Sequence, residues 1–64
     1  MSVEKRIVQI MDCLDRIEMG KYSTLSLPKC ADYLSWIYKY HPEKREEVEP
    51  LVVKATDLFD HGYL

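Results

Sequence analysis

Glycine and proline are scarce in this chain, with two glycines and three prolines among 64 residues, which excludes collagen-like and low-complexity proteins. No apolar run approaches the roughly 20 residues of a membrane span. No apolar segment follows Met1–Lys5 either, so we expect no membrane contact, no signal peptide and a cytoplasmic location. The chain has only two cysteines, Cys13 and Cys30. In a reducing compartment they are predicted to be free, buried thiols, with a bond between two helices as the alternative.

An excess of positive charge is also missing. Lys and Arg number nine against eleven Asp and Glu, which gives a net charge of -2, and the basic residues are dispersed without a cluster longer than two. Phosphate binding requires concentrated Lys and Arg. The composition therefore argues against nucleic acid as a partner.

What the chain does have is the composition of a globular protein, 47% hydrophobic and 31% charged. A chain of this size buries only about 60% of the surface that it exposes when unfolded, so it lies near the lower limit for folding on its own core. We expect one helical domain over residues 1–64, of the all-α class.

Three helices are predicted, with short connections that favour antiparallel neighbours in a small bundle. The first runs from Ser2, a good N-cap, to Met19, and Gly20 ends it. Its apolar residues recur at spacings of four and three: Val3, Ile7, Ile10, Leu14 and Ile17.

The second predicted helix begins after Ser26 as N-cap and ends near Tyr40, ahead of Pro42. Its core face is predicted to consist of Cys30, Ala31, Leu34, Ile37 and Tyr38. The connection before it is too apolar for a loose loop, so its members Tyr22, Leu25 and Leu27 are expected to pack on the bundle.

The third predicted helix extends from Pro42 to Asp60, with Gly62 as its stop. Pro50 lies inside it and predicts a kink or a short break near Glu47–Glu49, with a separate one-turn helix over Glu43–Glu47 as the alternative. Its core stripe contains Val48, Leu51, Val52, Ala55, Leu58 and Phe59, and Tyr63 and Leu64 are expected to fold back on the core.

The second helix carries more apolar surface than one neighbour can cover. Tyr33, Trp36 and Tyr40 follow one edge at spacings of three and four. Trp and Tyr are enriched among interface hot spots, so we predict that these three form a partner-binding or self-association surface. The alternative is that they cover the core.

A second and weaker candidate surface is the acidic row of Asp12, Asp15 and Glu18 on the first helix, beside methionines that adapt to a partner's shape. The alternative here is an ordinary solvated face. A spacing of four residues also suits Asp12 to an ion pair with Arg16.

The sequence contains almost no residue pattern that is typical of catalysis or of phosphate or metal binding. Neither glycine belongs to a phosphate-binding loop, and neither cysteine has a histidine near it in sequence. Asp57, Asp60 and His61 have the only metal-like spacing, and a solvated helix end explains it equally well. We therefore expect no enzyme, no cofactor and no metal.

The function predicted from the sequence is a small protein–protein interaction module, such as an adaptor, inhibitor or regulatory subunit, whose partner is another protein or a second copy. One alternative is a structural homodimer with no other partner. The other is a nucleic-acid-binding helical domain.

Overall fold

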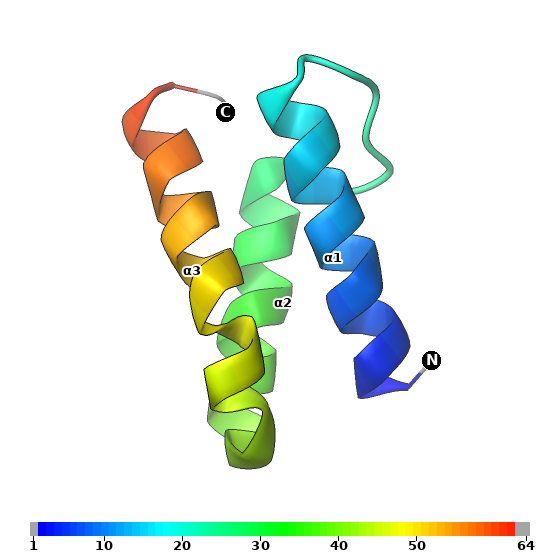
Figure 1. Ribbon diagram of the computed structural model, residues 1–64, viewed down its shortest axis with the longest axis vertical. Coiled ribbons are helices and arrows are strands. Elements are labelled where there is room, and N and C mark those ends of the chain that lie inside the picture. The colour runs from blue at the N-terminus through cyan, green and yellow to red at the C-terminus, as the bar shows by residue number, and fades with distance from the viewer. Residues whose placement is uncertain (1, 63–64) are drawn as a thin grey trace.

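The computed structural model describes residues 2–62. It contains the α-helices α1 (Val3–Glu18), α2 (Leu27–Tyr40) and α3 (Arg45–Asp60), with a short 3-10 helix, η1 (Pro42–Lys44), ahead of α3. The three long helices run up, down and up and pack side by side (Figure 1). The all-α three-helix bundle is confirmed. The predicted return of Tyr63 and Leu64 to the core lies outside the described residues.

The helix ends follow the local sequence. The hydroxyl oxygens of the N-caps Ser2 and Ser26 accept hydrogen bonds from the backbone N–H groups of Lys5 and Lys29, at 3.3 and 3.4 Å. Gly20 has a φ of 72°, and its neighbour Lys21 donates its N–H to the carbonyl of residue 16 at 2.8 Å. This 6→1 bond in a left-handed turn satisfies a carbonyl at the end of α1. The predicted first and last residues of α1 and α2 are therefore confirmed to within a residue or two.

The third helical segment changes from a 3-10 helix to an α-helix between η1 and α3. The break predicted near Glu47–Glu49 is therefore wrong in position, since the change comes earlier in the chain. Pro42 opens η1, and α3 begins at Arg45 and continues through Pro50. Because Pro50 has no N–H, the carbonyl of Glu46 receives no bond from it. Glu46 is exposed, so water can satisfy that carbonyl and the helix tolerates the proline.

The core runs along the line where the three helices meet. It contains twelve buried apolar residues: Ile7, Ile10, Cys13, Leu14, Leu27, Cys30, Leu34, Ile37, Val48, Leu51, Ala55 and Leu58. Most residues of the predicted stripes are among them, and Val3, Ile17, Leu25, Val52 and Phe59 pack against them partly buried. Both cysteines are free and buried, as predicted.

Two aromatic residues predicted to be covered are exposed instead. Tyr38 is 41% exposed and Tyr22 is 81% exposed. Leu34 and Ile37 already fill the part of α2 that faces the core, so the ring of Tyr38 extends outward, with the guanidinium carbon of Arg45 4.7 Å from its centroid. Leu25 of the α1–α2 connection and Leu27 at the start of α2 make the apolar contact, and Tyr22 is left in solvent.

Candidate interaction surface

The three residues of the predicted aromatic edge lie in two different environments. Tyr33 is partly buried and packs against the core. The guanidinium carbon of Arg6 lies 4.1 Å from its ring centroid, and the ammonium of Lys29 lies 5.9 Å from it. The cation–π contact of Arg6 joins α1 to α2, so Tyr33 belongs mainly to the packing of the bundle.

Trp36 and Tyr40 stand exposed near the C-terminal end of α2, with 46% and 61% of their surface accessible. A spacing of four residues places them on the same side of the helix, and their ring centroids are 6.3 Å apart. His41 packs its ring edge-on against Trp36 at 5.0 Å. We call Trp36, Tyr40 and His41 the aromatic cluster. His41 did not stand out in the sequence, although its position next to Tyr40 was the available signal.

The acidic row of α1 is engaged by cations of the same chain. Asp12 forms an ion pair with Arg16 at 2.9 Å. Asp15 and Glu18 both pair with Lys54 of α3, whose ammonium lies 3.3 Å from the Glu18 carboxylate. The hydrogen bond that Lys54 donates to the Asp15 carboxylate, joined by the one to Glu18, raises the pKa of Lys54. Two of the three predicted acidic residues therefore link α1 to α3.

The two thiols differ in acidity because their surroundings differ. Burial raises the pKa of Cys30 to about 11, and negative charge on Cys13 adds to the rise. Burial also acts to raise the pKa of Cys13, but hydrogen bonds from Ser23, Thr24 and the backbone of Leu25 outweigh it and lower that pKa. The Thr24 hydroxyl oxygen lies 3.5 Å from the Cys13 sulfur.

The residues with metal-like spacing at the end of α3 do not form a cluster of ligands. Across residues 2–62, no three His, Cys, Asp or Glu side chains come together in a way that could hold an ion. The Nδ1 of His61 lies 2.7 Å from the carbonyl oxygen of Asp57. A carbonyl can only accept, so this nitrogen is a donor and points back at its own helix. Within the same described range, no helix combines the length and the apolar character that crossing a bilayer requires.

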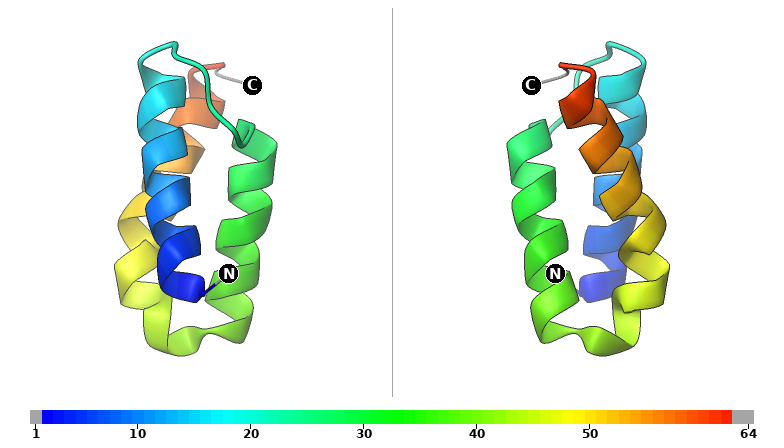
Figure 2. Two further views of the ribbon diagram at one scale, coloured as in Figure 1. Left: turned by 90° about the vertical axis from the view of Figure 1, so that its right-hand side faces the viewer. Right: turned by 90° about the vertical axis from the view of Figure 1, so that its left-hand side faces the viewer.

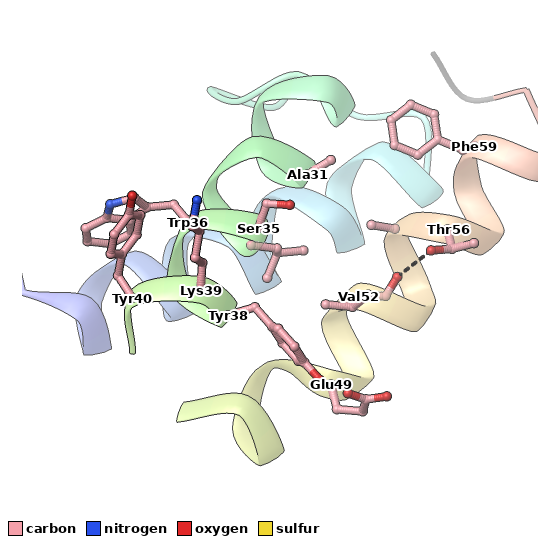
Figure 3. Close-up of a pocket in the computed structure, with 12 residues that line it drawn as sticks. Ala31, Ser35, Trp36, Tyr38, Lys39, Tyr40, Glu49, Val52, Thr56 and Phe59 are labelled. Atoms are coloured by element: carbon pink, nitrogen blue, oxygen red, sulfur yellow. Dashed lines mark hydrogen bonds between the residues drawn. The ribbon is translucent and has the colours of Figure 1, made fainter. Parts of the chain in front are cut away.

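A groove lies between α2 and α3 (Figure 3), and the sequence did not reveal it. The buried Leu34 and Ala55 form its floor. Its sides and rim come from residues of both helices: Ala31, Ser35, Tyr38, Lys39, Glu49, Val52, Thr56 and Phe59. We call it the α2–α3 groove. Its outer margin reaches Trp36 and Tyr40.

Fold and surface together define a small helical bundle with exposed aromatic and apolar surface and, among residues 2–62, no cluster of metal-ligating side chains. Comparison of the chain with models of known protein families, with curated proteins and with solved structures found no match. The functional assignment therefore rests on the residues themselves.

Proposed function

We propose that this protein is a non-catalytic interaction module, acting as an adaptor, inhibitor or regulatory subunit, which binds another protein through the aromatic cluster. The observation that carries the proposal is the exposure of Trp36 and Tyr40 side by side at the end of a helix. Large aromatic side chains provide much contact area at a small cost in conformational entropy, and Trp and Tyr dominate interface hot spots.

The aromatic cluster is already ordered before a partner arrives. The Trp36 ring contacts the rings of both Tyr40 and His41, and the ammonium of Lys39 lies 5.4 Å from the Tyr40 centroid. Such preorganisation reduces the entropy lost on binding. The matching partner presents an apolar recess for the indole.

Tyr33 contributes little to this surface, because the guanidinium of Arg6 covers its ring. That cover also counts against a platform on which Tyr33, Trp36 and Tyr40 would stack nucleic-acid bases, since stacking needs free ring faces. We further propose a cytoplasmic location, because two free thiols suit a reducing compartment.

The first experiment finds the partner by photo-cross-linking. A photoreactive amino acid replaces Tyr40 in the cells that make the protein, and the matched control carries it at Tyr22, an exposed tyrosine on the α1–α2 connection. We expect one protein to cross-link reproducibly from position 40 and not from position 22.

Affinity for the purified partner then tests the assignment. Trp36→Ala is expected to weaken binding about 30-fold, the effect of a hot spot worth about 2 kcal/mol. Tyr22→Ala is expected to bind as the wild type does. Equal affinity of Trp36→Ala and wild type would contradict the proposed function.

A further inference from the structure

We propose that a second copy of this chain occupies the α2–α3 groove, on a two-fold axis parallel to the helices, so that Lys39 of each copy meets Glu49 of the other. This inference goes beyond the proposed function, because the groove takes a copy of the chain while the aromatic cluster takes a different protein. The two surfaces meet at the margin of the groove, where the ammonium of Lys39 lies 5.4 Å from the Tyr40 ring centroid.

The shape and chemistry of the groove suit a helix. Ser35 and Thr56, both exposed and both small, lie on its two sides and let another helix approach closely. The Thr56 hydroxyl donates a hydrogen bond to the carbonyl of Val52 at 2.9 Å (Figure 3). The Thr56 hydroxyl proton therefore keeps its acceptor when a second copy covers the groove, and the Thr56 methyl group can pack against that copy. Tyr38 and Phe59 supply larger apolar surface toward the two ends.

The charges on the groove are complementary to those of a second copy. Lys39 lies near the C-terminal end of α2 and Glu49 in the N-terminal half of α3 (Figure 3). The C-terminal end of α2 and the start of α3 meet at the end of the bundle that holds η1 (Figure 2). Within residues 2–62, neither one forms an ion pair. The groove thus has one cation on its α2 side, in contact with the Tyr40 ring, and one anion on its α3 side, at the same end.

This arrangement selects the direction of the symmetry axis. A two-fold axis parallel to the helices sets α2 against α3 of the second copy, with like ends together. Lys39 then faces Glu49 of the second copy, and the pair occurs twice. A perpendicular axis would set the Lys39 end against the Ala31 end and would form neither pair. The parallel axis also makes every neighbour antiparallel in a four-helix arrangement of α2, α3 and their copies.

The size of the chain favours a weak dimer. A standard interface takes about 800 Å² from each partner, about a fifth of the 4376 Å² that this chain exposes. The apolar part of the groove is mixed with hydroxyl groups, so we expect dissociation in the micromolar range, on the order of 10 μM.

Sedimentation or light scattering, from roughly 1 to 100 μM, tests the proposal. The wild type is expected to pass from monomer to dimer over this range. Lys39→Glu and Glu49→Lys each place like charges together twice and are expected to weaken dimerisation at least about tenfold. An equimolar mixture of the two variants restores both pairs and is expected to form a heterodimer, as the double reversal K39E/E49K is expected to form a homodimer.

Matched controls separate a specific pair from a change in net charge. Lys21→Glu and Asp57→Lys alter the net charge in the same two directions at exposed positions outside the groove, and they are expected to dimerise as the wild type does. Thr56→Arg places a bulky charge inside the groove and is expected to be monomeric, with its helicity unchanged by circular dichroism.

Three outcomes would overturn the proposal. If the wild type is still a monomer at the highest concentration, a second copy does not occupy the groove, and a helix of a different protein becomes the candidate. A dimer that tolerates Lys39→Glu and Thr56→Arg forms elsewhere. A dimer that only Trp36→Ala dissociates uses the aromatic cluster. Trp36→Ala is expected to leave the groove dimer intact, so the dimer and the proposed function can fail separately.

Discussion

Cys13 and Cys30 are buried in the same core, yet the pKa of Cys13 is lowered and that of Cys30 is raised. Cys30 has no exposed surface and an apolar setting, which keeps its pKa near 11. Cys13 lies under the α1–α2 connection, where hydroxyl groups lower its pKa despite burial. A thiolate is the reactive form of cysteine, so Cys30 is expected to stay inert in the folded protein.

The raised pKa of Cys30 predicts a loss of stability at high pH. The unfolded chain releases this proton near pH 9.0 and the folded chain near 11. The stability is therefore complete below pH 9 and is lost as the pH rises toward 11. We expect wild type to lose about 1 kcal/mol more than Cys30→Ala between pH 7 and pH 10.

Urea unfolding of both proteins at the two pH values, under reducing conditions, measures this difference. Cys30→Ala starts from a lower stability because it leaves a small cavity, so the changes with pH are compared rather than the absolute values. Equal losses in the two proteins would show that Cys30 does not titrate in this way.

At the level of the helices, α3 is the element whose sequence conflicts most with its structure. Pro50 lies in its second turn and removes one backbone hydrogen bond. The helix survives because Val48 and Leu51 on either side of the proline are buried in the core and because Lys54 links α3 to α1. Tertiary packing here outweighs local propensity.

Pro50→Ala is accordingly expected to raise the free energy of unfolding by about 1 kcal/mol. Proline costs about 3 kcal/mol relative to alanine inside a helix, and part of that gain is offset because the unfolded alanine chain is more flexible. Urea unfolding checks the effect, and Val53→Ala, on the exposed side of the same helix, serves as the control. A less stable Pro50→Ala protein would contradict this account of α3.

For the whole molecule, the small core sets the margin of stability. Residues 2–62 include twelve buried apolar residues, and a domain of this length has a free energy of unfolding of about 3 to 10 kcal/mol. A single cavity is therefore a large fraction of the total. Association with a second copy would add buried surface to a chain that has little.

Leu14→Ala tests this margin, since Leu14 has no exposed surface. The substitution is expected to cost about 2 to 5 kcal/mol, a large fraction of the total, so the thermal midpoint is expected to fall well below that of the wild type. Val8→Ala, on the exposed face of the same helix, is expected to change stability by less than about 0.5 kcal/mol. Thermal unfolding followed by circular dichroism measures both, and a cooperative Leu14→Ala transition near that of wild type would contradict the prediction.

Features that depend on residues close in sequence were predictable. Capping by Ser2 and Ser26 and the left-handed stop at Gly20 each involve groups within about five residues, so the pattern contains all the participants. The core stripes were predictable for a related reason, because helical periodicity alone determines which residues share a face. The burial of both thiols followed from their positions on those faces, and their free state from the expected reducing compartment.

Features that depend on how the helices are placed were not predictable. The pattern of α2 assigned Tyr38 to the core because its angle on the helix is close to that of Leu34, but the arc that α1 and α3 cover ends between them. The ion pairs of Asp15 and Glu18 were also not predictable. In the sequence these residues resemble a solvated acidic face, and only the packing of α3 on α1 brings Lys54 beside them.

The amino-acid sequence by itself determined the three helices, their ends and the apolar face of each, because hydrogen bonds and side-chain periodicity within a helix are local. Tertiary structure alone decided which apolar residues remain outside the core. The two proposed interaction surfaces are what the three helices leave uncovered: the aromatic cluster at the end of α2 and the α2–α3 groove. Their composition depends on the rotation and spacing of whole helices, which no single stretch of the chain specifies.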